Sequence, residues 1–232
     1  MKKLEPFKVT KTGPLYRVKR PSQVDRKLID SVEWRKEQRL LSFDFKPVRV
    51  PSKPIPFKIP RKYCWRVACY STGPGIKSAL KPCPEAGITP RPPASFAEHL
   101  RASWAAYRSY RKKWGKLVPP GIIAAYPKYV KESVKKSTSL MIFRGKKLVG
   151  LFSHLKTTGV LDDKQNYVCW YELFPGLTAA ERRSARCQAS HWLKKTAKRR
   201  VSVLVESYEK DAFEFFSSLG FTTRRVVIER RA

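Results

Sequence analysis

The chain has 232 residues, of which 50 are Lys or Arg and 18 are Asp or Glu, and its formal net charge is +32 at pH 7. Ordinary solvated surfaces mix both signs, so this excess predicts a polyanionic partner, with nucleic acid the leading candidate. The composition argues against a membrane protein. No apolar run approaches the roughly 20 residues of a spanning helix, and the apolar residues alternate with Pro and Arg.

Cysteine use and the first residues predict a reducing compartment. The five cysteines follow no framework spacing, and no histidine pair completes a zinc site with Cys64 and Cys69, so we expect no metal site. Glu5 and Lys8 interrupt the first apolar residues, so no secretory signal is expected. We therefore expect reduced, mostly buried thiols in a cytoplasmic or other reducing compartment, and not a secreted protein.

Residues 1–93 form a predicted basic, proline-rich extension, with 14 of the 18 prolines and a net charge of 22 − 7 = +15. One helix is expected at about 23–42, where Ser22 and Asp25 match a capping box and a loose apolar stripe follows. The stretch 43–67 alternates Pro, Lys or Arg and apolar residues, so it is not expected to form a central strand. It would lie extended, either over a partner or around the rest of the chain.

A linker at 71–93 ends this extension, and a second domain is expected over 94–232. The domain begins with an amphipathic helix at about 96–114, where Ser95 and Glu98 form a capping box and aromatic residues repeat every three or four positions. Those rings either pack in the core, which is the commoner use of such a stripe, or stack on nucleotide bases.

The rest of the domain is expected to contain a hairpin, a strand, a basic helix, a strand, a short helix and a last strand, at 139–155, 167–174, 178–200, 201–207, 212–219 and 226–231. The strand at 167–174 is apolar on both faces, as a central strand should be. Gly220 is the expected left-handed cap of the short helix.

This order and the closing segment resemble the GNAT superfamily of acyltransferases. The resemblance covers roughly 96–231 and is carried by the central strand ending at 173–175, by Ala212 and Phe216, and by the closing Leu219-Gly220-Phe221. It implies an α+β or α/β fold with a GNAT-like mixed, splayed β-sheet flanked by helices. It also implies acetyl-CoA or another acyl-CoA lying in the splay, with its pyrophosphate at the start of the 178–200 helix.

The sequence departs from that superfamily in two places. The phosphate-loop pattern (Gln/Arg)-x-x-Gly-x-(Gly/Ala) matches a register without either glycine, namely Arg182, Arg183, Ser184, Ala185, Arg186 and Cys187. Glycine lets the backbone approach a phosphate closely, so Ala185 and Cys187 narrow that approach, while the arginines supply charge. Where many members carry a Tyr that protonates the leaving thiolate, this chain has Phe216, and Tyr208 is the nearby substitute.

Glu172 is the other catalytic candidate, on the central strand beside the implied splay. It is the candidate general base for the acceptor amine, directly or through water, and the alternative is a surface carboxylate paired with an arginine. His154 and His191 are also titratable, and each is expected to be structural.

Two functions remain open on these grounds. The first is a GNAT-like acyl-CoA-dependent N-acyltransferase that associates with nucleic acid or a ribonucleoprotein through its basic N-terminal arm and basic helices. The second is a catalytically inactive GNAT-like nucleic-acid-binding component of a large assembly such as a ribosome. The net charge, the altered phosphate loop and Phe216 favour the second. The strand–helix–strand order, Glu172, Tyr208 and the arginines at the helix start favour the first, which is the function that we predict from the sequence.

Overall fold

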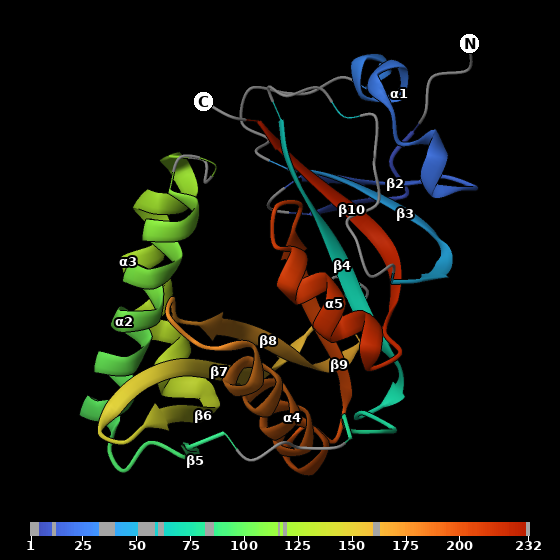
Figure 1. The fold of residues 1–232 in the computed structure, drawn as a ribbon. Helices are drawn as coiled ribbons and strands as arrows, with labels where there is room; N and C mark the ends of the chain where they lie inside the picture. The colour runs from blue at the N-terminus through green and yellow to red at the C-terminus, as the bar shows by residue number, and fades with distance from the viewer. Residues whose placement is uncertain are drawn as a thin grey trace. The chain divides into compact units, whose positions relative to one another are not determined.

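The computed structural model describes residues 5–10, 13–32, 40–50, 59, 63–81, 86–115, 117, 120–159 and 163–230. The chain divides into two compact units, one made of Met1–Tyr70 with Leu204–Ala232 and the other of Ser71–Val203. Their elements are labelled in Figure 1. The sequence placed a division at residue 93. The units part elsewhere because the last strand of the chain pairs with strands of the N-terminal region.

The first unit is built on β10 (Thr222–Arg230), which runs antiparallel to both of its neighbours, β3 (Leu40–Arg49) and β4 (Tyr63–Pro74). The strands β2 (Gly13–Arg17) and β1 (Lys8–Thr10) follow beyond β3, so the order is β1-β2-β3-β10-β4. Three helices complete the unit: the 3₁₀ helix η1 (Pro21–Gln23), α1 (Arg26–Ser31) and α5 (Lys210–Ser218).

The prediction that 43–67 contributes no central strand is wrong. β3 pairs with β2 on one side and with β10 on the other, so it is an interior strand. Pro47 is tolerated because the β3–β10 register shifts at this point: Val48 is opposite Thr223, but the next pair joins Asp44 to Arg225. A proline at such an irregularity removes no ladder hydrogen bond.

The predicted helix at about 23–42 is also too long. α1 covers only Arg26–Ser31, and β3 begins at Leu40. The N-cap is Asp25, whose side chain accepts a hydrogen bond from the backbone N–H of Leu28 at 3.0 Å. Asp25 therefore starts a helix three residues beyond Ser22, the predicted cap.

The core of the first unit lies against β3 and β10, where Phe43, Leu41, Val226 and Ile228 are fully buried. Phe213, Phe215 and Phe216 of α5 are buried as well. Gly220 follows this helix with φ of +75°, which confirms the predicted left-handed cap.

The second unit carries the remaining elements: β5 (Ile88–Arg91), α2 (Phe96–Trp114), α3 (Pro120–Lys136), β6 (Ser137–Arg144), β7 (Lys147–Thr158), β8 (Lys164–Leu173), α4 (Ala179–Thr196) and the start of β9 (Arg200–Glu206). The strand order is β9-β8-β7-β6-β5, with β8 parallel to β9 and the other pairs antiparallel. β5 and the end of β4 are strands inside the segment that the sequence predicted as a linker.

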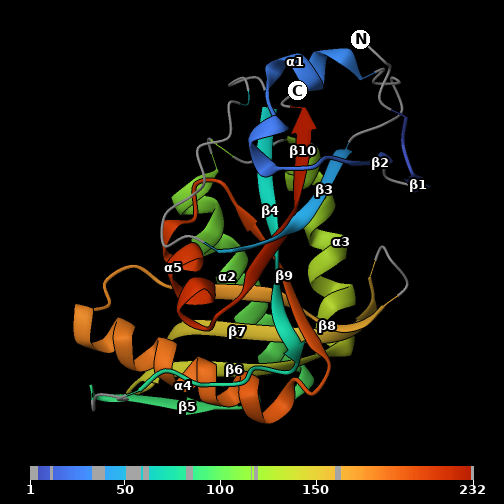
Figure 2. The same ribbon diagram turned by 90° about the vertical axis from the view of Figure 1, so that its right-hand side faces the viewer.

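The helices of this unit cover opposite faces of its strands, with α4 in front and α2 behind in Figure 2. Neighbouring residues of β8 show the same division. The Trp170 ring lies 6.1 Å from that of Tyr126 on α3, whereas the Tyr171 hydroxyl accepts a hydrogen bond from Arg186 on α4. Successive side chains of a strand point to opposite faces, so α3 and α4 lie on different sides.

Part of the aromatic stripe of the 96–114 helix lies in the core, while Phe96 is exposed and Trp104 and Trp114 are partly buried. α2 has the predicted bounds and is capped by Ser95, which accepts a hydrogen bond from the backbone N–H of Glu98. Tyr107 and Tyr110 are buried and pack on the Tyr126 ring, with centroids 5.0 and 5.8 Å away. No described helix is both long and apolar enough to cross a membrane.

Candidate functional site

β8 pairs with its two neighbouring strands over different lengths. It pairs with β7 from Lys164 to Leu173, but its recorded pairs with β9 are confined to Gln165–Tyr167. Just beyond, the β7–β8 register shifts so that Cys169 is skipped, as in a β-bulge. The half of β8 that carries Glu172 therefore lies past the pairing with β9.

Glu172 is a buried carboxylate held by α2. Its side chain is 4% exposed and accepts hydrogen bonds from the Ser109 hydroxyl at 2.7 Å and from the Lys113 ammonium at 2.6 Å. Ser109 and Lys113 lie one helical turn apart and so share a face of α2. The ammonium of Lys113 also donates to the carbonyl oxygen of Leu173.

Burial raises the pKa of the Glu172 carboxyl, and the positive charges of Lys113 and Arg182 oppose that rise. Glu172 is thus not the surface carboxylate of the alternative interpretation, and Ser109 and Lys113 donate hydrogen bonds to it. The sequence did not identify Lys113 and Ser109 as its partners. Their four-residue spacing on a capped helix was the available signal, but nothing in the sequence said which strand they would meet.

Tyr208 lies in the turn between β9 and α5, in the first unit, and is partly buried. Glu172 belongs to the second unit, so the two predicted catalytic residues are carried by different units. Phe216 is fully buried, with the rings of Phe215 and Phe221 each 5.1 Å from its own. It is a core residue of the first unit.

The start of α4 is capped by its own side chains. Thr178 accepts a hydrogen bond from the backbone N–H of Glu181, and the Glu181 carboxylate accepts one from the N–H of Thr178 at 2.7 Å. The Arg144 guanidinium donates hydrogen bonds to both oxygens of the same carboxylate, at 2.5 and 2.7 Å, and another to the Gly176 carbonyl oxygen. Hydrogen bonding from Arg144 is the main cause that lowers the pKa of Glu181.

The predicted phosphate-loop residues lie inside α4, from its fourth residue onward. The backbone N–H of Arg182 donates a hydrogen bond to the carbonyl oxygen of Thr178 at 3.0 Å. In an α-helix each following N–H likewise donates to the carbonyl oxygen four residues earlier. Ser184, Ala185 and Cys187 face the interior, and Cys187 is disulfide-bonded, contrary to the expected free thiol. Any contact of this segment with a phosphate must therefore come through arginine side chains.

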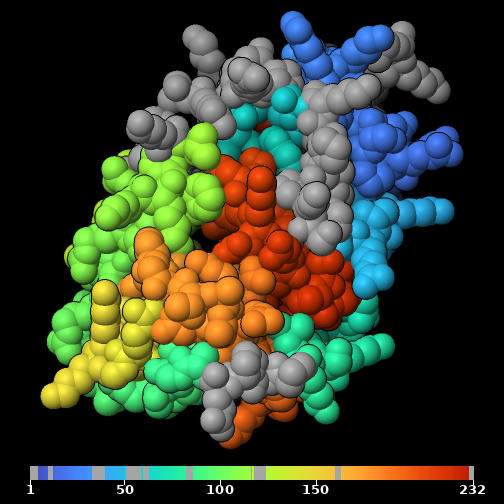
Figure 3. Space-filling view, viewed as in Figure 1, coloured from blue at the N-terminus to red at the C-terminus, as the bar shows by residue number. Residues whose placement is uncertain are grey.

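These three arginine side chains differ in their exposure to solvent. Arg183 is exposed, while Arg182 and Arg186 are partly buried, and the Arg186 guanidinium donates to the Tyr171 hydroxyl at 3.2 Å. Figure 3 shows α4 and the loop before it, in orange, at the surface of the second unit.

The residues at this helix start fit the anionic part of acyl-CoA by charge. The amides of Ala179 and Ala180 belong to the first turn, where an α-helix leaves N–H groups without an intrahelical acceptor. Arg144 forms an ion pair with the capping Glu181. Arg182 and Arg183, the next two residues of the helix, add positive charge. The set lacks the glycine backbone that lets a loop enclose a diphosphate.

The two histidines are placed as structural residues. His154 is 3% exposed, between Asn166 of β8 and Thr196 of α4. His191 lies on α4, with its ring Nε2 3.2 Å from the carbonyl oxygen of Leu80. Among the described residues no group of His, Cys, Asp and Glu could hold a metal ion.

Comparison of the sequence with models of known protein families and with curated proteins finds no match. Among solved structures, the chain is similar to a functionally unknown conserved protein from Staphylococcus epidermidis (10% identity, TM-score 0.49, 97% of this chain and 87% of that chain). It is also similar to an acetyltransferase from Streptococcus agalactiae (12%, 0.44, 63% and 99%). A third is the PaiA N-acetyltransferase from Thermoplasma acidophilum in complex with coenzyme A (13%, 0.43, 62% and 99%). At such identities and TM-scores the likeness carries no inference about function.

Proposed function

We propose that the chain is a GNAT-like acyl-CoA-dependent N-acyltransferase in which Glu172 is the general base. The observation that carries this is the burial of Glu172 on the half of β8 past its pairing with β9. An acceptor amine must lose a proton, and a carboxyl of ordinary pKa, about 4.3, is a weak base at neutral pH. Burial strengthens Glu172 as a base, while Lys113 keeps its ionised form accessible.

In the proposed site, acetyl-CoA or another acyl-CoA supplies the activated acyl group. The side chains of Arg182, Arg183 and Arg186 hold its diphosphate beside the first-turn amides of α4, in place of a glycine loop. Ser184, Ala185 and Cys187 of the predicted loop contribute by packing the helix. The role of Tyr208, in the first unit, as donor of a proton to the leaving thiolate stays a prediction from the sequence.

Thermal unfolding with acetyl-CoA tests the cofactor. A ligand at a hundred times its Kd stabilises a protein by about 2.7 kcal/mol, which corresponds to a rise in Tm of about 5–11 °C for a chain of this size. The shift should disappear in Arg182→Gln with Arg183→Gln and persist in Lys194→Gln with Lys195→Gln, exposed lysines of the same helix. No shift in the wild type at millimolar acetyl-CoA would contradict the proposal.

Acetyl transfer to a panel of amines and basic peptides, followed by release of CoA, tests Glu172. Glu172→Gln keeps the side chain's shape and should lower the rate about 10²–10⁴-fold while leaving the acetyl-CoA shift intact. The matched control is Glu132→Gln, because the Glu132 carboxylate is exposed and lies 4.0 Å from a surface lysine. Equal rates in the two variants would remove Glu172 from the reaction.

A second function is favoured by the net charge of +32. We propose that the chain associates with RNA or DNA, or with a ribonucleoprotein, through its basic N-terminal region and basic helices. Binding to a short single-stranded RNA should weaken steeply with salt. Strong RNA binding without acetyl-CoA stabilisation or acyl transfer would instead support the inactive structural component. A flat salt response would refute the association.

A further inference from the structure

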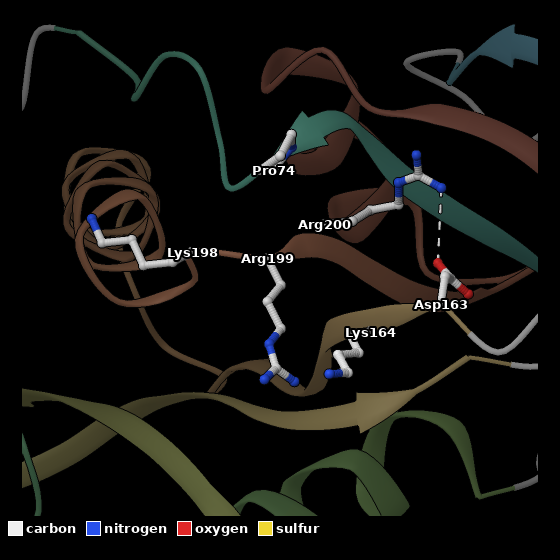
Figure 4. A pocket seen from close by; sticks show the side chains of 6 residues that line it. All are labelled: Pro74, Asp163, Lys164, Lys198, Arg199 and Arg200. Atoms are coloured by element: carbon white, nitrogen blue, oxygen red, sulfur yellow. Dashed lines mark ion pairs between the residues drawn. The ribbon is translucent and has the colours of Figure 1, made fainter.

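A pocket of about 430 Å³ lies at the far end of α4 from the proposed acyl-CoA site (Figure 4). It is lined by Pro74, Asp163, Lys164, Lys198, Arg199 and Arg200, all in the second unit. Arg182 and Thr196, the last residue of α4, are fourteen residues apart, or about 21 Å along a helix at 1.5 Å per residue, and Lys198 follows the end of the helix. The pocket is therefore separate from the arginines near the start of α4.

Backbone contacts fix the side of the pocket that carries Arg199 and Arg200. The N–H of Gly75 donates to the Arg199 carbonyl at 2.7 Å, and Gly75 forms a parallel bridge with Arg200. The N–H of Arg199 donates to the buried side chain of Asn166 at 3.0 Å. Gly75 has φ of +66°, and a Cβ there would lie 3.0 Å from the Ala197 carbonyl oxygen, so this close approach favours glycine.

The charges of the lining are unbalanced. Four of the lining side chains are cationic, and the one carboxylate, Asp163, lies 3.8 Å from the Arg200 guanidinium. Figure 4 shows Arg199 and Lys164 directed toward a common space, away from that ion pair. Like charges held together repel one another, so a bound anion would relieve the repulsion.

The end of the helix does not account for all of this charge. A helix C-terminus carries about half a negative charge, which favours a nearby cation. Lys198 takes that place, because its ammonium lies 3.5 Å from the Lys194 carbonyl oxygen. Lys164 is on β8 and Arg199 immediately precedes β9, so neither is needed as a helix cap.

We infer that this pocket binds a phosphate group of a nucleic-acid backbone, with Arg199 and Lys164 as its two principal contacts. A guanidinium matches two phosphate oxygens at once, and an ammonium adds a point charge. The inference rests on the nucleic-acid association proposed above and assigns it one defined contact point.

The test measures RNA affinity of the full chain against salt concentration, with a short single-stranded RNA as the probe. In Lys164→Gln with Arg199→Gln, loss of two phosphate contacts should lower the slope of log Kd against log salt by about 1.4, or about 0.7 per contact. The control Lys146→Gln with Lys147→Gln removes the same charge from exposed positions at the β6–β7 turn, outside the pocket and outside the basic helices. It should change the slope much less.

Equal slopes in the two variants, with RNA binding retained, would overturn the pocket assignment and leave the association standing. Absence of RNA binding in the wild type would overturn both. Inorganic pyrophosphate is the probe for a free phosphate. If it stabilised the wild type but not the pocket variant, and both bound RNA equally, the nucleic-acid assignment would be refuted. Both variants should match the wild type in the urea concentration at the unfolding midpoint, since surface substitutions change stability little.

Discussion

His154 makes the stability of the second unit depend on pH. Asn166 donates to its Nδ1 at 3.2 Å, while Nε2 lies 2.9 Å from the Thr196 hydroxyl, which itself donates to the Trp192 carbonyl. The Asn166 oxygen accepts the N–H of Arg199, so its amide cannot turn round without losing a bond. This arrangement fits the neutral ring, with the proton on Nε2, because a proton on Nδ1 would face an N–H donor.

Burial, with a smaller contribution from the charge of Lys156, lowers the pKa of His154 from 6.5 to about 4. The unfolded chain therefore takes up the proton at higher pH than the folded protein does. Stability contributed by His154 is complete above about pH 6.5 and is lost as the pH falls through about 4. At 1.36 kcal/mol per pKa unit, the loss between pH 7 and pH 4 is about 3 kcal/mol.

Urea unfolding of the wild type and of His154→Gln, at constant ionic strength from pH 7 to pH 4, measures this loss. The variant lacks the titrating ring, so the difference in unfolding free energy between the two proteins should shrink by about 3 kcal/mol over that range. Other titrating groups contribute equally to both proteins and cancel. A difference that stays constant within about 0.5 kcal/mol would refute the assignment of a neutral, buried His154.

Two further predictions concern stability. Asp44→Ala should cost about 3–5 kcal/mol in urea unfolding, because it leaves the buried Arg225 guanidinium without the carboxylate that it contacts at 2.6 and 3.1 Å. Asp44→Leu with Arg225→Met should recover most of that loss, and a double variant as unstable as the single one would contradict the explanation. Thr178→Ala should cost about 1 kcal/mol as a lost N-cap, with Thr158→Ala, on an exposed end of β7, as the control.

The sequence predicted the elements of the second unit well because their signals are local. Ser95 with Glu98, and the aromatic repeat behind them, gave the bounds of α2. The first unit was predicted poorly. Pro47 argued against a central strand, and only the register shift with β10, a strand far away in sequence, shows why a proline is accepted there.

The sequence identified residues of the candidate site but not their arrangement in space. Glu172 was chosen for its position on a central strand, yet its partners Ser109 and Lys113 come from a helix about sixty residues earlier in the chain. The arginines at the start of α4 were expected to flank a phosphate loop. They lie within the helix because Thr178 and Glu181 cap it before them.

The sequence by itself determined the charge, the cap of α2 at Ser95 and the order of strands and helices from β6 to β10, since each depends on composition or on neighbours within a few residues. The tertiary structure decided which of these residues meet. It buried Glu172 against Lys113, divided the catalytic candidates between two units, and gathered Lys164, Arg199 and Arg200 around one pocket. Contacts of this kind join distant parts of the chain, and hydrophobic periodicity specifies a buried face without specifying what covers it.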